Sequence, residues 1–145
     1  MVDITSKPES YREATAKGRI KLRAETVKRI KEGRIEKGDP IYAARIAGIL
    51  ATKNTSNIIP LCHPIPVTNI KVDIRVSASD MVEVESTIKT KAQTGVEMEA
   101  LMATAVALLT IWDMTKQYEK DSAGQYPYTL IKEIRLIRKV KEQNR

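Results

Sequence analysis

The sequence is poor in the residues that build disulfide frameworks, zinc sites and aromatic binding platforms. It contains no phenylalanine, one cysteine, one histidine, one tryptophan and five tyrosines among 145 residues. A single cysteine excludes an intrachain disulfide framework and suits a reducing cytoplasm. A zinc site would need carboxylates to complete four ligands, so we expect no metal. The scattered aromatic residues argue against a surface on which RNA bases stack.

Long apolar runs and glycine-rich loops are also missing. The run 100–112 is too short to span a bilayer, and residues 1–13 lack the apolar segment of a signal peptide. Six glycines are too few for a phosphate cradle, and no dinucleotide or metalloprotease motif is present. We therefore expect one domain, residues 1–145, in the cytoplasm and without membrane contact or cofactor.

The net charge of +7 is concentrated near the two ends of the chain. Solvated strand faces would explain this charge without any ligand. An anionic small molecule or a nucleic acid would explain it equally well. Composition alone does not decide between these readings.

The order of patterns predicts an α+β fold. Residues 1–16 are expected to be irregular at first, and 54–67, with three prolines, is expected to be an ordered loop. The expected elements are a strand at 18–23, helices at about 25–31 and 40–52, strands at about 69–77 and 82–90, a helix at about 95–119, and a strand at 131–140. Asp39 and Pro40 suit a helix start, and Ser79-Asp80 suits a hairpin turn. The sequence therefore predicts a ferredoxin-like βαββαβ arrangement with an antiparallel sheet and helices on one face.

The segment 94–116 places charged residues at both ends of an otherwise apolar helix. Burying such charges without partners is costly. Thr94 and Glu97 have the spacing of a capping box, which would explain Glu97 without any function. The cap does not explain Glu99, because a residue two positions further on points to a different side of the helix. If Glu99 faces the core, it would need a cationic partner. Asp113 and Lys116 have the spacing of a local ion pair.

Spacing along this helix leads to a prediction about assembly. Glu99 and Asp113 are 14 residues apart, so their Cα atoms should be about 21 Å apart along a continuous helix. One small-molecule site on one chain can hardly use both. If these residues act together, two subunits build the site.

Cys62 and His63 are the only residues of their kinds. Neighbouring side chains in an extended chain point in opposite directions, so they are a poor nucleophile–base pair, and we expect Cys62 to be a buried small apolar residue. A lone histidine is more often structural than catalytic, although a proline-bounded loop favours function. Lys37 precedes a helix start that suits an anion, but this signal is weak.

Three motifs together resemble a known family. The segments LCHPIPVTNIKV, TGVEMEAL and TIWDMTK are similar to signatures of molybdenum cofactor biosynthesis protein C, the cyclic pyranopterin monophosphate synthases. The resemblance extends to VDITSK and KGDPIYAARIAGILATK, and thus to nearly the whole chain.

This resemblance implies a ferredoxin-like subunit, dimers assembled into a hexamer, and sites at the dimer interface. It implies rearrangement of a 3',8-cyclised GTP to cyclic pyranopterin monophosphate with release of pyrophosphate. The implied catalytic residues are Lys37, Asp113 and Lys116. The implied substrate-binding residues are Arg12, His63, Glu97, Met98, Glu99 and Lys139.

The resemblance also suggests roles. Lys116 is expected to be a general acid or base, and Lys37, from the neighbouring subunit, a second one. Arg12, Lys37 and His63 would stabilise the phosphates, while Glu97 and Glu99 would accept hydrogen bonds from the guanine-derived amino groups.

The chain departs from the family pattern in two places, and two other functions compete with a synthase. Gln93 replaces a frequent lysine, and VKEQNR follows the last strand in place of a glycine-lysine-serine tail, so Lys139 is matched across a length change. The runner-up function is a nucleic-acid-binding ferredoxin-like module, and an inert regulatory subunit is a third.

Overall fold

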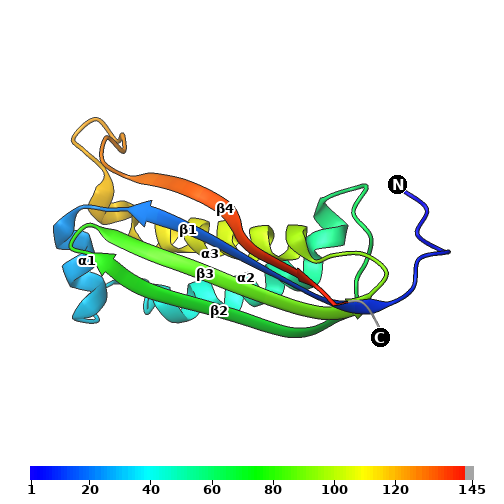
Figure 1. Ribbon diagram of the computed structural model, residues 1–145. Coiled ribbons are helices and arrows are strands. Elements are labelled where there is room, and N and C mark those ends of the chain that lie inside the picture. Colours follow the sequence, from blue (N-terminus) through cyan, green and yellow to red (C-terminus); the bar gives the residue numbers. More distant parts are fainter. Residues whose placement is uncertain (143–145) are drawn as a thin grey trace.

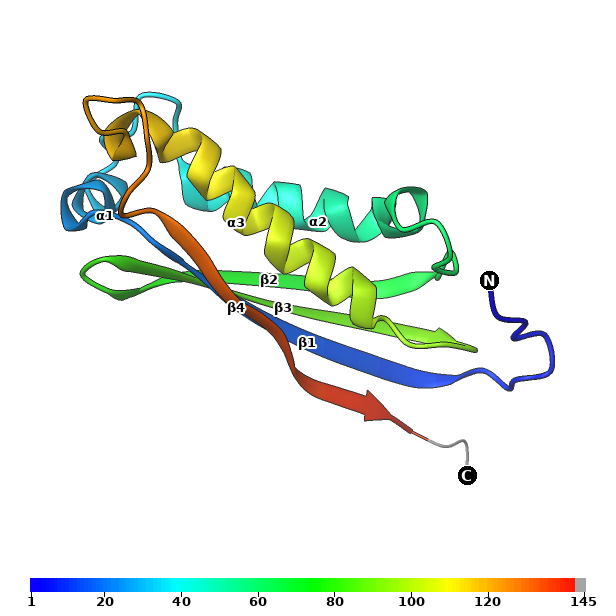
Figure 2. The same cartoon turned by 90° about the horizontal axis from the view of Figure 1, so that it is seen from above.

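The computed structural model describes residues 1–142, so the end of the VKEQNR segment, 143–145, lies outside the described residues. The elements are β1 (Ser10–Lys21), α1 (Ala24–Lys31), α2 (Pro40–Ile58), β2 (Val67–Ala78), β3 (Met81–Ala92), α3 (Glu97–Glu119) and β4 (Leu130–Lys141) (Figure 1). The four strands form an antiparallel sheet in the order β2-β3-β1-β4. Helices α2 and α3 cover one face of that sheet (Figure 2). The predicted ferredoxin-like arrangement is thus confirmed.

The core lies between this sheet and the two long helices. Alternate residues of the central strands point to the helices, among them Ala16 and Ile20 of β1 and Val84 and Ile88 of β3, all fully buried. Helix α3 contributes small and branched side chains to this core, namely Ala100, Ala103, Ala107, Leu108 and Ile111. A Cβ added to Gly18 would come within 2.8 Å of Leu108, so a glycine in β1 lets α3 approach closely.

By length and composition alone, α3 could cross a membrane. In the folded chain it contacts α2 and the strands β1, β3 and β4, and these contacts account for its apolar residues.

Helix α2 is longer than predicted, since it continues from Thr52 to Ile58. Polar side chains that suggested a loop donate hydrogen bonds to carbonyls four residues earlier, Thr52 to Gly48, Asn54 to Leu50 and Thr55 to Ala51. The helix stops when Ile59, the residue before Pro60, adopts an extended conformation. The predicted loop at 54–67 is therefore wrong over its first five residues.

Strand β1 begins at Ser10, so residues 10–16 are not irregular as predicted. Small Ala14 and Ala16 alternate there with Glu13 and Thr15, a pattern too weakly apolar to indicate a strand. Other predictions are confirmed. Asp39 accepts hydrogen bonds from the backbone of Ile41 and Tyr42 at the start of α2, and residues 79–80 form the hairpin turn.

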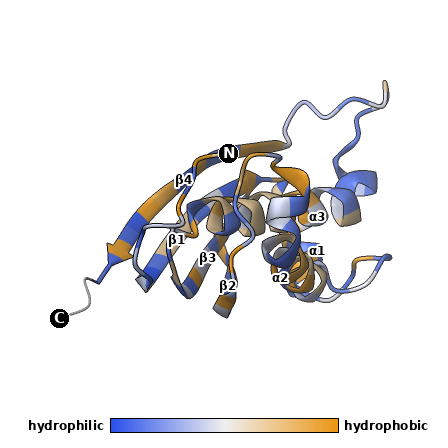
Figure 3. Cartoon of the chain, turned by 90° about the vertical axis from the view of Figure 1, so that its right-hand side faces the viewer, coloured by the Kyte–Doolittle hydropathy of each residue, from blue (hydrophilic) through white to orange (hydrophobic). Residues whose placement is uncertain are grey.

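The sheet face away from the helices is charged, and its outer edge is partly apolar. Glu83 of β3, only 3% exposed, pairs with Lys17, Arg19 and Arg75. At the edge, β4 exposes Leu130, Ile134, Leu136 and Ile137 (Figure 3). A second apolar stripe, Tyr42, Ile46 and Leu50, recurs every four residues along α2 and is also exposed.

Candidate active site

The first turn of α3 carries Glu97, which meets the end of β4. Glu97 forms an ion pair with Lys139 and accepts a hydrogen bond from its own backbone N–H. Burial alone would raise the pKa of Glu97, but Lys139, this hydrogen bond and the charge of Arg12 outweigh burial and lower it. Glu97 is therefore an ionised carboxylate flanked by two cations.

The predicted capping box is wrong, because the N-cap of α3 is Val96 and no side chain bonds there. Instead, the Glu97 carboxylate lies against the backbone of Gly95. A Cβ at Gly95 would overlap Oε2 of Glu97. The absence of a side chain at position 95 thus leaves the space in which Glu97 turns toward Lys139.

Arg12 of β1 completes this end of the site. Its Nε donates to the carbonyl of Ala92 at 3.2 Å, and Nη2 donates to the carbonyl of Gln93 at 3.2 Å. These two bonds hold the guanidinium beside Glu97, at the turn that leads from β3 into α3. They also leave its remaining donors available for another acceptor.

Glu99, two residues further on, is only 3% exposed. Burial raises the pKa of Glu99; its own backbone N–H lowers it, and the nearby charge of Glu97 raises it further. Within residues 1–142, no ion pair links Glu99 to a cation. The cationic partner expected for Glu99 is therefore not in the described part of its own chain.

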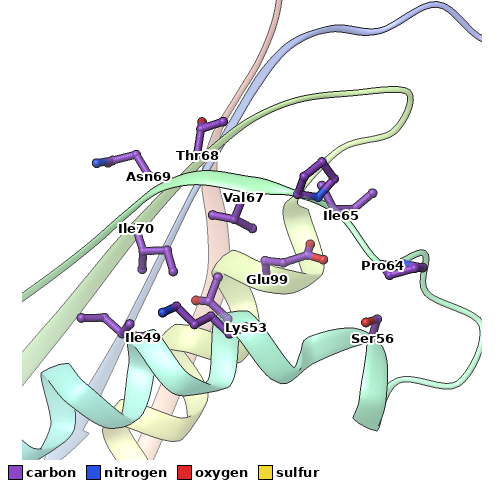
Figure 4. Close-up of a pocket in the computed structure, with 12 residues that line it drawn as sticks. Ile49, Lys53, Ser56, Pro64, Ile65, Val67, Thr68, Asn69, Ile70 and Glu99 are labelled. Atoms are coloured by element: carbon purple, nitrogen blue, oxygen red, sulfur yellow. The ribbon is translucent and has the colours of Figure 1, made fainter.

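Glu99 reaches two neighbouring hollows. One, of about 510 Å³, is lined by Cys62, His63, Glu97 and Met98 as well as Glu99. The other, of about 690 Å³, lies between α2 and the start of β2, with Lys53 at its wall. Figure 4 shows Glu99 extending from α3 into this second hollow, across from Ser56 and Pro64. The Glu99 carboxylate thus borders both hollows.

The loop 59–66 supplies the polar groups opposite α3. The Cys62 Sγ lies 4.0 Å from Oε1 of Glu99, and burial, then the charge of Glu99, raises the pKa of the thiol. Cys62 is half-buried at the hollow, so the expectation of a buried apolar residue is wrong. His63 Nε2 is 2.7 Å from the carbonyl oxygen of Val2. The imidazole must carry its proton on Nε2 to make this bond.

A second cluster lies at the opposite end of α3. Asp113 pairs with Lys116 at 3.0 Å and with Lys37 at 3.1 Å, and Lys37 also donates to the Asp113 carbonyl. Hydrogen bonds from Lys116 and then Lys37 lower the pKa of Asp113, while Asp113 raises the pKa of Lys116. All three side chains are solvent-accessible. Asp113 thus stabilises the ammonium form of Lys116.

The structure divides the predicted residues into two groups. The carboxylate cluster consists of Arg12, His63, Glu97, Met98, Glu99 and Lys139. The lysine cluster consists of Lys37, Asp113 and Lys116. The continuous helix α3 holds the two clusters apart. Lys37 was expected to come from the neighbouring subunit to join Lys116. In the structure it pairs with Asp113 of its own chain, which also pairs with Lys116, because the loop after α1 ends beside the last turns of α3.

Sequence reasoning missed Lys53 and the contact between Cys62 and Glu99. Lys53 falls just outside the predicted helix 40–52, because the end of α2 is predicted too early. The i, i+4 spacing from Ile49 to Lys53 was the signal that could have placed both on one helix face. Across residues 1–142, no three His, Cys, Asp or Glu side chains gather in a way that could hold a metal.

Comparisons with known proteins find similarity along nearly the whole chain. The model of the MoaC family matches residues 1–142. A probable cyclic pyranopterin monophosphate synthase of Pyrococcus furiosus is 56% identical over 143 residues, which cover 99% of this chain and 91% of the relative. Proteins with the same name from Saccharolobus solfataricus and Sulfurisphaera tokodaii are 54% and 57% identical, over 99% and 97% of this chain and 96% and 93% of the relatives.

Proposed function

The chain belongs to the MoaC family, and from this premise we propose that it is a cyclic pyranopterin monophosphate synthase of molybdenum cofactor biosynthesis. Its substrate is (8S)-3',8-cyclo-7,8-dihydroguanosine 5'-triphosphate, and its products are cyclic pyranopterin monophosphate and pyrophosphate. The observation that carries this proposal is the pair of acid–base clusters at the two ends of α3, within a chain that matches the family along residues 1–142.

The reaction needs several proton transfers, because the imidazole part of the purine opens and a pterin ring closes. Lys116 is the general acid or base of these steps, and its ion pair with Asp113 fixes the position of its ammonium. Lys37 is the second lysine, linked to it through Asp113. Asp113 holds the ammonium groups of both lysines in position.

The carboxylate cluster binds the substrate. Glu97, whose pKa is lowered, and Glu99 accept hydrogen bonds from the guanine-derived amino groups. Arg12 contacts phosphate oxygens. His63, whose Nε2 donates to Val2, accepts a hydrogen bond from the substrate at Nδ1, and Met98 lines the hollow beside it. No metal or cofactor is required by this division of roles.

We infer that two subunits join the clusters into one site. Because the clusters lie at opposite ends of a 23-residue helix, a single chain presents only half of the required groups to one small molecule. Glu99 is buried without a cation in the described part of its own chain, and a lysine of another subunit would supply one. The apolar edge of β4 and the apolar stripe on α2 offer two separate contact surfaces.

Two such surfaces suit a dimer that assembles further, and we propose dimers forming a hexamer. We also propose that residues 1–145 act as one domain in the cytoplasm. The nucleic-acid-binding alternative has no support from the comparisons. The basic sheet face is partly neutralised, since Glu83 and Glu85 pair with its cations.

The direct test is pyrophosphate release by the purified protein supplied with the cyclised GTP, with plain GTP as the control substrate. Release from the cyclised compound only, together with a fluorescent pterin after oxidation, is the expected result. If a folded, oligomeric sample releases no pyrophosphate from the cyclised GTP, the proposal is contradicted.

A further inference from the structure

Tyr118, in the last turns of α3, contacts the loop that carries Lys37. We propose that Tyr118 is a positioning residue, which acts through this loop to fix the Lys37 ammonium in the lysine cluster. This inference rests on the proposed function, because that function gives Lys37 its role in catalysis. The Lys37 loop is defined as residues 32–39, between the end of α1 and the start of α2.

The Lys37 loop needs an anchor from outside itself. Ile35 is buried, whereas the other residues of 32–39 are exposed. Gly33 and Gly38 have φ angles of 67° and 116°, so the backbone turns in the left-handed region on both sides of Lys37. A lysine side chain has many rotamers, and its ammonium can be held in one place only if the backbone beneath it is also held.

Two consecutive residues of this loop dock on the end of α3. The Glu36 N–H donates to the Tyr118 hydroxyl at 2.9 Å, and the Glu36 carboxylate accepts a hydrogen bond from Gln117 Nε2 at 3.1 Å. The Lys37 Nζ donates to the Asp113 carbonyl at 3.0 Å and to Oδ2 at 3.1 Å. Asp113 and Gln117 are four residues apart and therefore share one face of the helix. The anchor of Glu36 thus lies beside the ion pair of Lys37.

Tyr118 also contacts the helix that precedes the loop. The Arg29 guanidinium of α1 lies 4.7 Å from the centre of the Tyr118 ring, which is a cation–π contact. Since α1 leads directly into the Lys37 loop, one tyrosine contacts both parts of this segment. The ring packs against α1, and the hydroxyl holds the loop. Loss of the hydroxyl alone should therefore loosen the loop while the ring stays packed.

Such a change should affect catalysis more than folding. Glu36 is exposed, so its N–H can bond to water when the tyrosine hydroxyl is absent, and little global stability is lost. Lys37 would then visit a wider range of positions. A displacement of about 1 Å in a catalytic arrangement can lower a rate by up to about 100-fold. The loss should appear in kcat more than in KM, because Lys37 is proposed to act in proton transfer.

The test compares Tyr118→Phe, which keeps the ring, with Gln117→Ala, which removes the second hydrogen bond to Glu36. The matched control Tyr128→Phe removes an exposed hydroxyl from a ring that lies 4.4 Å from the Arg23 guanidinium. In steady-state pyrophosphate release, Tyr118→Phe should lower kcat about fivefold or more and leave KM within about twofold of wild type. Gln117→Ala should change kcat in the same direction, and the control should match wild type.

Two further readouts distinguish positioning from a general structural role. When Tyr118→Phe is added to Lys37→Ala, the single-turnover rate should not fall further, because the hydroxyl acts through Lys37. Limited acetylation of lysines, followed by mass spectrometry, needs no turnover. In Tyr118→Phe, Lys37 should be acetylated about threefold faster or more, since one hydrogen bond no longer holds the loop. Exposed Lys91, on β3, should react as in wild type.

The outcomes separate this inference from the proposed function. If the wild type turns over the cyclised GTP but Tyr118→Phe keeps its kcat and its Lys37 reactivity, the inference is wrong and the function stands. If Tyr118→Phe lowers the rate equally with Lys37 present and absent, Tyr118 is only structural and the inference is wrong. If the wild type shows no turnover but Lys37 becomes more reactive in Tyr118→Phe, Tyr118 positions Lys37 and the proposed function fails. Should Tyr118→Phe not fold, Gln117→Ala gives the same comparisons.

Discussion

At the scale of single residues, the surroundings shift the pKa values of the two carboxylates in the first turn of α3 in opposite directions, although the residues are only two positions apart. Cations lower the pKa of Glu97, whereas burial raises that of Glu99. Pairs of acids whose surroundings separate their pKa values are a common way to divide acid and base roles. This contrast supports different tasks for the two residues on the same substrate.

Lys116 is the residue whose loss should affect turnover most. Replacing it with alanine removes the proton donor and should lower kcat by about 10²–10⁴-fold, the usual contribution of a general acid or base. Steady-state pyrophosphate release measures this effect. Lys120→Ala, an exposed lysine just after α3, is the matched control and should stay close to wild type. Activity of Lys116→Ala within about tenfold of wild type would remove Lys116 from this role.

Gly95 should control the position of Glu97. A methyl group in Gly95→Ala would overlap the Glu97 carboxylate and push it away from Lys139, while the flexible end of a glutamate can move at little cost to folding. We expect a small change in melting temperature, a raised pKa of Glu97 as it loses Lys139, and a higher KM. NMR titration of the Glu97 carboxyl measures its pKa, and steady-state kinetics measures the KM. An unchanged Glu97 pKa would show that Gly95 does not position it.

At the scale of helices and strands, patterns in the sequence predict every element but not every end. Alternating apolar residues identify β2 and β3, and Asp39-Pro40 marks the start of α2. The end of α2 is not predictable in this way, because Thr52, Asn54 and Thr55 can bond either inside a helix or in a loop. Only the tertiary contacts of buried Thr52 and Thr55 select the helix.

Prediction from the sequence has the same limit for the candidate active site. Spacing separates Glu99 from Asp113 correctly, because the rise of a helix is fixed. Pairing between elements distant in sequence is not encoded in spacing. The contact of Lys37 with Asp113 depends on how α1 and its following loop pack against the end of α3, and that of Lys139 with Glu97 depends on the register of β4.

Glu119, at the C-terminal end of α3, should be a stabilising residue rather than a catalytic one. Its fully buried carboxylate accepts hydrogen bonds from the Arg23 N–H and from the hydroxyls of Thr26 and Thr129. Glu119→Ala would leave these donors buried without partners and should lower the free energy of unfolding by about 3 kcal/mol or more.

Urea unfolding at matched protein concentration measures this loss. Exposed Glu25→Ala, which removes one surface ion pair with Arg34, should cost less than about 1 kcal/mol. A loss for Glu119→Ala no larger than that of the control would contradict the account.

Glu83 should make the stability of the sheet depend on pH. Burial would raise the pKa of Glu83, but hydrogen bonds from Arg75 and Arg19 and the charge of Lys17 lower it below its ordinary value of 4.5. A lowered folded pKa means that the stabilisation is present above 4.5 and is lost as the pH falls through the folded pKa. Glu83→Gln should therefore be less stable than wild type at pH 7, with a difference that shrinks in acid. A difference that grows below pH 4 would contradict this assignment.

At the scale of the whole molecule, the fold presents the two clusters at opposite ends of one helix and leaves apolar side chains on β4 and α2 exposed. Isolated exposed apolar residues are ordinary, but rows along one strand and one helix face indicate contact surfaces. The basic charge of the chain gathers partly at the carboxylate end, in Lys7, Arg12, Lys139 and Lys141, where a triphosphate would arrive. In the proposed shared site, assembly, charge and catalysis would all depend on this one arrangement.

The most direct test of this arrangement mixes two inactive variants. Glu99→Gln destroys one half of the site and Lys116→Ala the other, so each variant alone should be nearly inactive. If two subunits share each site, a dimer containing one of each variant has one site with both wild-type halves. Random exchange of subunits should then restore about a quarter of the wild-type activity. A mixture that remains as inactive as the separate variants, although subunit exchange is demonstrated, would contradict a site shared between subunits.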